Sequence, residues 1–346
     1  MRVRADHPAP AVPFRPGRVE YAGSVTGDAS LGTAAGPAGR VSTSLPELVE
    51  HVAGEYGLGP VGDWSVLATG YEDCNIDLRA RRARVVIQVF AAGRPAGIAD
   101  RTAGIIAAVT AAGVRHPRLH ADAAGRDVHA YDRHRLLVMD FAPGQTFYDL
   151  GRPPGEAELA KVVEQAALIH AVEARPEPVF DSWAIANLVP LAGQVGDLLD
   201  GEQRRLVDGA IAELARVDFG SLPSALIHAD LTAGNVLLGP DGEITVLDFA
   251  LANRWPRLQE LAVIAASLLH GSAEALPARM DKVARLYSSA GPRPLTPAEE
   301  AALPAVGRAA AAMELLGGLN QWRQGNRGPE TDSLIDIGTT GLRDYA

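Results

Sequence analysis

The chain has 346 residues, 47% of them hydrophobic, which is enough apolar material for a full core divided between two lobes or domains. Its formal net charge is −10 and its pI is about 5.4. This balance argues against a protein that coats a nucleic-acid backbone, because such proteins usually carry a basic stripe. An acidic surface fits a small cationic substrate, and it fits ordinary solubility equally well.

The cysteine content and the N-terminal sequence bear on the compartment. Cys74 is the single cysteine, so the chain has neither an internal disulfide nor a pair of thiolates for a metal. The first residues lack the apolar segment of a secretory signal, and no stretch of about 18 apolar residues is free of charges or Gly/Pro breaks. We therefore expect a cytoplasmic protein without a membrane segment and without a nucleic-acid partner.

The N-terminal third changes character twice. Residues 1–44 are rich in Pro, Gly, Ala, Ser and Thr and have no hydrophobic period, which predicts a disordered extension. A helix is predicted from Pro46 to about Tyr56, capped by Ser44 or Thr43. The following pattern predicts five strands and one helix, in the order Trp64–Ala68, Asn75–Arg79, Val85–Phe90, the helix Ile98–Ala112, Asp127–Tyr131 and Leu136–Phe141. We therefore expect a five-stranded antiparallel sheet with one helix in an N-lobe, 45–142.

Pro143-Gly144 breaks this pattern, and the remaining residues are mainly helical. Short strands are predicted at Leu226–Ile227 and in a hairpin, Val236–Leu238 and Thr245–Leu247, that turns at Asp241-Gly242. The predicted helices are Glu156–Val172, Ala192–Leu199, Glu202–Arg216, Leu258–Leu269, Glu274–Ser289 and a last one that starts in a capping box at Thr296 and runs toward Trp322. The fold class expected is α+β, with a helical C-lobe, 143–346, and a cleft beside the segment after Met139.

The most informative segment is Leu226 to Asp248, LIHADLTAGNVLLGPDGEITVLD. Phosphoryl transfer requires a carboxylate at the attacking hydroxyl, metal ligands between the phosphates and positive groups over them. Asp230 can accept or orient the proton of the hydroxyl. Asn235, on the same loop, and Asp248, at the end of the next strand, offer the oxygen ligands that magnesium prefers. We expect His228 to support the loop by hydrogen bonding.

This segment carries a resemblance. HADLTAGNVL followed by VLDF is similar to the catalytic and metal loops of the aminoglycoside phosphotransferase family, which includes choline kinases and type II homoserine kinases. Protein kinases share the Asp-x-x-x-x-Asn spacing but have Arg between His and Asp, and Asp-Phe-Gly at the metal. Ala229 and Ala250 stand at those two positions here and favour the small-molecule branch. The resemblance covers residues 46–325 and implies a bilobal protein-kinase-like fold.

The resemblance also implies the cofactors and the roles of the loop residues. ATP and Mg²⁺ are the expected cofactors, with Asp230, Asn235 and His228 catalytic and with Asn235 and Asp248 on the metal. The strand that ends in Met139, Asp140 and Phe141 is similar to the hinge strand whose backbone meets adenine, although any buried edge strand has the same pattern.

Three further positions match the family less specifically. Thr69–Asp73 falls where the phosphate-covering loop should lie, and its single glycine is Gly70. Glu260 stands where the family usually has an Asp that braces the catalytic loop. His170 matches a histidine of the family that belongs to the core.

Two positions depart from the family pattern. The third strand usually carries a Lys that pairs with the α- and β-phosphates, and here the corresponding residue is Gln88. The next helix usually carries a Glu that holds this Lys, and here Ala103 stands there, with Asp100 one turn earlier. Gln88 can still donate its amide hydrogens to a phosphate oxygen, and Arg94 or an arginine of the Arg79–Arg84 turn is a candidate for the missing charge.

These observations leave three functions open. The first is transfer of the γ-phosphate to a hydroxyl of a small molecule or natural product. The second is phosphorylation of Ser or Thr in a peptide precursor, together with a partner protein of the same biosynthetic pathway. The third is a pseudokinase that binds nucleotide or serves as a scaffold. Acidic candidates for the acceptor side are Asp149, Asp181 and Glu260.

Overall fold

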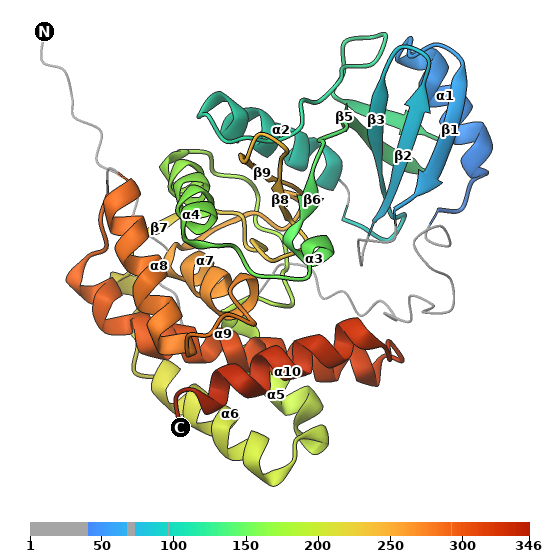
Figure 1. Ribbon diagram of the computed structural model, residues 1–346. Helices are drawn as coiled ribbons and strands as arrows, with labels where there is room; N and C mark the ends of the chain where they lie inside the picture. The colour runs from blue at the N-terminus through green and yellow to red at the C-terminus, as the bar shows by residue number, and fades with distance from the viewer. Residues whose placement is uncertain (1–40, 68–72, 96, 292) are drawn as a thin grey trace, which may run out of the picture.

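The computed structural model describes residues 41–67, 73–95, 97–291 and 293–346. The predicted extension therefore lies outside the described residues up to position 40, and so do positions 69–72 of the predicted phosphate loop, including Gly70. The described residues form a β-rich N-lobe and a mainly helical C-lobe (Figure 1). This arrangement confirms the predicted α+β class.

A five-stranded antiparallel sheet forms the N-lobe, with the strand order β1-β2-β3-β5-β4. Its strands are β1 (Val61–Val66), β2 (Cys74–Ala80), β3 (Arg84–Phe90), β4 (Val128–Tyr131) and β5 (His134–Asp140). Two helices cover the sheet. Helix α1 (Leu45–Glu55) lies on the face away from the C-lobe, and α2 (Ile98–Ala111) lies on the face toward it (Figure 1). The predicted helix and strand order is therefore confirmed in this lobe.

Alternation along β3 determines which side chains face α1 and which face α2. Val85, Ile87 and Val89 are buried in one apolar cluster with residues of α1. Val86 and Phe90 pack in the other cluster, which includes α2. Because successive strand residues point to opposite faces, Gln88 lies on the α2 face between Val86 and Phe90.

The packed structure begins slightly before the predicted boundary at residue 44. Val41 is buried, and both the backbone N–H and the hydroxyl of Ser42 lie within hydrogen-bond distance of His134 Nε2, at 3.2 and 3.1 Å. Residues 41–43 therefore lie against the sheet. Ser44 occupies the N-cap position of α1, as predicted, but its side chain makes no capping hydrogen bond.

The C-lobe is built around one long helix. Helix α9 (Pro297–Arg323) is buried along most of its length, and α10 (Pro329–Arg343) lies along it (Figure 1). A Cβ at Gly338 would lie 2.2 Å from the backbone nitrogen of Leu315, so a glycine is required where the two helices approach. The remaining helices are α3 (Phe147–Leu150), α4 (Glu156–Ala171), α5 (Leu188–Val195), α6 (Gly201–Leu214), α7 (Leu258–Val263) and α8 (Leu276–Ala290).

Two small sheets position the loops of this lobe. β7 (Ser224–Ile227) pairs with β10 (Asn253–Pro256), and β6 (Gln145–Thr146), β8 (Val236–Leu238) and β9 (Ile244–Val246) form the other sheet. The predicted hairpin is thus β8 and β9. The predicted helix Leu258–Leu269 is α7 followed by a π-helical turn, Ile264–Leu268. The sequence reasoning did not predict β6, α3, β10 or α10.

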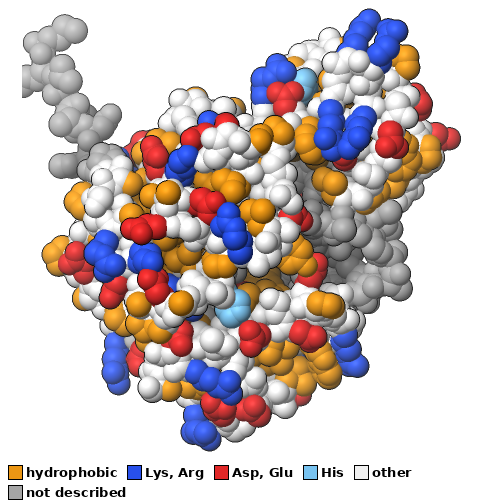
Figure 2. Space-filling model, viewed as in Figure 1, with side chains coloured by type: hydrophobic (Ala, Val, Ile, Leu, Met, Phe, Trp, Pro, Cys, Tyr) orange, Lys and Arg blue, Asp and Glu red, His pale blue; other side chains and the backbone are white. Residues whose placement is uncertain are grey.

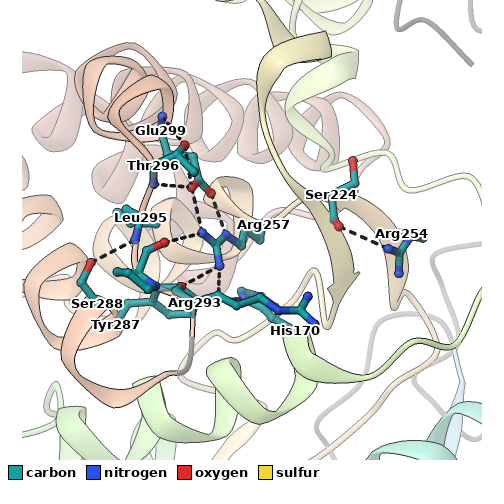
Figure 3. A network of polar contacts seen from close by, with 11 residues as sticks. His170, Ser224, Arg254, Arg257, Tyr287, Ser288, Arg293, Leu295, Thr296 and Glu299 are labelled. Atoms are coloured by element: carbon teal, nitrogen blue, oxygen red, sulfur yellow. Dashed lines mark hydrogen bonds and ion pairs between the residues drawn. The ribbon is translucent and has the colours of Figure 1, made fainter. Parts of the chain in front are cut away.

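A buried polar network fixes the start of α7 (Figure 3). The guanidinium of Arg257 binds both carboxylate oxygens of Glu299 at 2.7 and 2.8 Å, and it donates to Tyr287 Oη at 3.2 Å. Glu299 also closes the predicted capping box with Thr296. His170 Nδ1 contacts Tyr287 Oη at 2.8 Å, and burial lowers the pKa of His170 to about 3. His170 is therefore a neutral core residue, as predicted.

On the face drawn in Figure 2, basic side chains gather in small groups among acidic ones and form no stripe. None of the helices in the described residues has the length and apolar character needed to cross a membrane.

Candidate active site

His228 links the loop after β7 to the end of β9. Its ring is fully buried, its Nδ1 accepts the backbone N–H of Asp230 at 3.2 Å, and its Nε2 donates to the carbonyl of Leu247 at 2.8 Å. Burial lowers the pKa of His228 to about 4, so the ring is neutral at physiological pH with the proton on Nε2. The ring therefore holds the two loops that carry the predicted catalytic and metal residues.

Glu260, on α7, supports the same loop through hydrogen bonds to its backbone. Its carboxylate accepts the backbone N–H groups of His228 and Ala229 at 3.0 and 2.8 Å. Ala229 has a φ of 73°, a left-handed conformation that costs a residue with a Cβ about 1–3 kcal/mol. The two hydrogen bonds offset this cost and fix the peptide before Asp230. Burial raises the pKa of Glu260 to about 7.

Asn235 and Asp230 form one hydrogen-bonded unit. Asn235 Nδ2 donates to Asp230 Oδ2 at 2.6 Å and to the Asp230 carbonyl at 3.1 Å. This orientation turns the amide oxygen of Asn235 away from Asp230. The backbone carbonyl of Asn235 accepts the N–H of Leu247 at 2.9 Å. Asp248 is the next residue after Leu247, so this hydrogen bond brings it close to the loop of Asn235. Asp248 has a φ of 59°, and its Oδ1 accepts the N–H of Ala250 at 3.1 Å.

Acidic side chains surround Asp230. Burial raises the pKa of Asp230 well above its ordinary value, and the charges of Asp248, Asp181 and Glu314 raise it further. Glu314 lies on α9, and burial raises its own pKa to about 7. Asp181 and Glu314 are buried, Asp230 is half-buried and Asp248 is exposed, so the carboxyl groups lie between the core and solvent. A bound cation would relieve their mutual repulsion.

The three acidic residues predicted for the acceptor side differ in position. Asp181 is buried and lies close enough to Asp230 to raise its pKa. Asp149 is exposed and caps α3 through Thr146. Both oxygens of Glu260 are bound to backbone amides, so Glu260 braces the loop and does not face an acceptor. Glu314, which the sequence reasoning missed, joins Asp181 at Asp230. Its position in an Ala- and Leu-rich helix gave no signal.

The backbone at the end of β5 bonds to a different segment on each side. The N–H of Phe141 donates to the Arg84 carbonyl of β3 at 3.2 Å, whereas the N–H of Asp140 donates to the Arg118 carbonyl at 2.9 Å. In an antiparallel ladder the N–H and C=O of one residue point the same way. The carbonyl of Asp140 therefore points away from β3. Met139, one residue earlier, is buried.

Side chains also fix this segment. The carboxylate of Asp140 binds Arg118 Nε at 3.1 Å and His120 Nε2 at 2.6 Å, and these partners lower its pKa. The guanidinium of Arg84 lies 3.3 Å from the ring centroid of Phe141 and forms an ion pair with Asp77 at 2.7 Å. Arg84 is thus held at the opposite end of β3 from Gln88.

Gln88 has no ionic partner on α2. The helix is described over its whole length, and its buried residues are Ile98, Ala99, Thr102, Ala103, Ile105, Ile106 and Val109. Asp100 is exposed, so it does not take the place of the family's Glu. Gln88 itself is 4% exposed. Of the candidate cations, Arg94 forms an ion pair with Asp73 at 3.6 Å.

Arg101 makes the connection between α2 and the loop that follows Asp248. Its guanidinium donates to the carbonyls of Ala252 and Glu177, the latter at 2.6 Å, and approaches the carbonyl of Ala250 at 3.4 Å. Burial lowers its pKa to about 10, so the side chain remains charged at neutral pH. The sequence reasoning missed this residue, because an arginine in an apolar helix does not show where its side chain will bind.

Comparisons with known proteins bear on the family and the fold of this chain. The profile described as "Phosphotransferase enzyme family" matches residues 63–298. A homoserine kinase of Rhodopseudomonas palustris (strain TIE-1) is 25% identical over 282 residues, which cover 80% of this chain and 84% of that protein. Among solved structures, a microcompartment-associated aminopropanol kinase has a TM-score of 0.67 at 17% identity, covering 86% of this chain and 95% of that one. An amicoumacin kinase in complex with AMP-PNP, Ca²⁺ and Ami has a TM-score of 0.62 at 13% identity, covering 89% and 95%.

Proposed function

Because the chain belongs to the phosphotransferase enzyme family, we propose that it is an ATP-dependent kinase that phosphorylates a hydroxyl group of a small molecule carrying an ammonium group. One observation carries the proposal. Asp230 is half-buried, is bound to Asn235, and feels the charges of Asp181, Asp248 and Glu314. This arrangement combines a group that can hold the acceptor hydroxyl with an environment that favours a cation.

Asp230 orients the acceptor and takes its proton as phosphate is transferred. Burial and the neighbouring carboxylates raise the pKa of Asp230, and a neighbouring positive charge would lower that pKa. The hydrogen bond from Asn235 fixes one carboxylate oxygen and so orients the carboxylate toward the acceptor hydroxyl. The neutral ring of His228 and the carboxylate of Glu260 act as supports of the loop.

Asn235 and Asp248 fit a divalent metal. The amide oxygen of Asn235 faces away from Asp230, and one oxygen of Asp248 is not used by the N–H of Ala250. Both are hard oxygen donors of the kind that magnesium takes. When bound, the ion would neutralise charge on the phosphates.

We assign the nucleotide to the region between β5 and the loops of the C-lobe. The carbonyl of Asp140 is directed away from β3, and it is the proposed acceptor for the amino group of adenine. Gln88 lies on the α2 face of β3 and can donate its amide hydrogens to a phosphate oxygen. A complexed AMP-PNP in the similar amicoumacin kinase supports ATP over GTP.

The ammonium group is the finer part of the proposal. Homoserine and aminopropanol, named in two of the similar proteins, each combine an amino group with a hydroxyl. Asp181 and Glu314 offer charges for such a group on separate elements, and their repulsion of Asp230 would fall when it binds. No observation favours a peptide acceptor or a pathway partner protein, and a pseudokinase has no need for the Asp230–Asn235 unit.

The test measures nucleotide consumption by the purified protein with Mg²⁺, comparing ATP with GTP. The acceptors are amino alcohols, each paired with a neutral alcohol of the same size. We expect ATP-dependent phosphorylation of an amino alcohol, lost in Asp230→Ala while nucleotide binding persists. Equal turnover of the neutral partner would refute the ammonium assignment. Nucleotide binding without transfer to any acceptor would favour the pseudokinase.

A further inference from the structure

Two histidines meet on the far side of the N-lobe, away from the catalytic loops. His51 projects from α1 and His129 from β4, and their Nε2 atoms lie 2.8 Å apart. His129 alternates with Val128, which packs in the α2 cluster, so its side chain lies on the α1 face of the sheet. His51 is exposed, and His129 is 4% exposed. The pair is thus open to solvent on one side only.

A buried carboxylate orients the inner histidine. His129 Nδ1 lies 3.1 Å from Asp122 Oδ2, and the side chain of Asp122 is fully buried. Asp122 also accepts the N–H groups of Ala124 and Arg126 and the guanidinium of Arg126. An anionic carboxylate accepts only, so Nδ1 of His129 carries the proton and Nε2 presents its lone pair to His51. This is the carboxylate–histidine arrangement that supports metal ligands in proteins.

A further carboxylate lies beside the inner histidine. Glu55 follows His51 by one turn on α1, and residues four apart share a helix face. The side chains of Glu55, Asp122 and His129 offer ligand atoms that all lie within 4.8 Å of one another. Glu55 therefore adds negative charge beside His129.

The spacing of the imidazoles suits a transition metal. Two nitrogens at about 2.05 Å from a tetrahedral zinc ion lie about 3.3 Å apart, and the observed separation of 2.8 Å requires only a small rotation of the exposed His51 ring. We propose that His51 and His129 form a binding site for Zn²⁺ or a similar divalent transition metal, with Asp122 as the positioning residue and with the charge of Glu55 beside His129. Water would complete the coordination on the exposed side.

Such a site would join α1 to the edge strand of the sheet. Helix α1 contributes Leu48, Val49 and Val52 to the apolar cluster on this face. A metal bound by His51 and His129 would add a link between α1 and β4 at the solvent-exposed border of this cluster. The face is opposite to the one that carries Gln88. The proposed metal would therefore act on the stability of the N-lobe and would not take part in phosphoryl transfer.

The test is Zn²⁺ binding to the full chain, prepared without a polyhistidine tag and measured by isothermal titration calorimetry with excess Mg²⁺. Imidazole sites favour zinc over magnesium, so the excess Mg²⁺ occupies the oxygen ligands of the candidate active site. We expect one strong zinc site, a rise in melting temperature, and, with Co²⁺ as the probe, the visible bands of a low-coordinate complex.

Substitutions assign the site. His51→Ala changes an exposed side chain, so the fold should persist, and affinity should fall by at least roughly tenfold; Asp122→Asn should cost roughly 10- to 100-fold. The matched control is His270→Ala, which removes a histidine that lies 3.3 Å from Asp336 in the C-lobe and should leave zinc affinity unchanged. The absence of strong zinc binding, or equal affinity in wild type and His51→Ala, would overturn the proposal.

Discussion

Replacing Glu314 by glutamine tests how strongly burial perturbs a carboxyl group that acts on Asp230. Burial raises the pKa of Glu314 from its ordinary 4.5 to about 7. Since one pKa unit corresponds to about 1.36 kcal/mol, the raised value amounts to about 3 kcal/mol. A carboxyl group whose pKa is raised in the folded state binds protons more tightly there, so it stabilises the fold at low pH. This stability is lost as pH rises from about 4.5 to about 7.

Glu314→Gln removes the titration and keeps the shape. We expect the free energy of unfolding of the variant, relative to wild type, to rise by about 2–3 kcal/mol between pH 5 and pH 8. Urea unfolding at a series of pH values measures this difference. The control is Glu300→Gln, which removes an exposed charge from the same helix and should give a difference that does not vary with pH.

The same variant has a kinetic consequence. Because the charge of Glu314 raises the pKa of Asp230, its removal should move the rising limb of the kcat/KM profile to lower pH. The KM for a cationic acceptor should also rise. If the stability difference between variant and wild type is the same at pH 5 and pH 8, Glu314 ionises as a hydrated carboxyl and the reasoning on the acidic site is wrong.

Three further substitutions address the nucleotide side and the packing of the C-lobe. Gln88→Lys should lower the KM for ATP by about fivefold, since a hydrogen bond from a charged donor is about 1 kcal/mol more favourable than one from a neutral donor. An unchanged or higher KM would show that another cation already binds the phosphates. Arg101→Lys should lower kcat more than it changes the melting temperature, because an ammonium cannot replace a planar group bound to several carbonyls; wild-type kcat in this variant would contradict a role in placing the loop after Asp248. Gly338→Ala should lower stability by about 1–3 kcal/mol through overpacking against α9, as measured by urea unfolding; a neutral result would mean that α10 shifts freely.

The sequence pattern was enough to predict the candidate site where its residues lie close together in the chain. The spacing of His228, Asp230 and Asn235 and the hairpin that leads to Asp248 predicted which residues meet, and the structure brings them into one hydrogen-bonded unit. The roles of these residues in transfer stay a prediction. The order of the strands and the helix along the chain of the N-lobe followed equally well, since each strand there carries its own apolar alternation.

Elements that depend on distant partners were not predictable in the same way. Helix α10 packs against α9 through Gly338 and Gly341. Glycines carry no apolar side chain, so this part of the contact surface does not appear in a hydrophobic pattern. β10 is a short strand that exists because β7 lies beside it. Glu314 and Asp181 come from separate parts of the chain, and only the fold shows that both act on Asp230.

The loss of the expected ion pair at Gln88 has a structural counterpart elsewhere on α2. In the family pattern one charge pair joins the third strand, the helix and the phosphates, whereas here the buried positions of α2 hold no acidic residue. Instead, Arg101 of this helix donates to the carbonyl of Ala252, in the loop after Asp248, and to the carbonyl of Glu177. A lysine at position 88 without a glutamate would be a buried cation whenever nucleotide is absent. A neutral Gln88 avoids that cost, and the placement of α2 then depends on a contact to the C-lobe that does not require ATP.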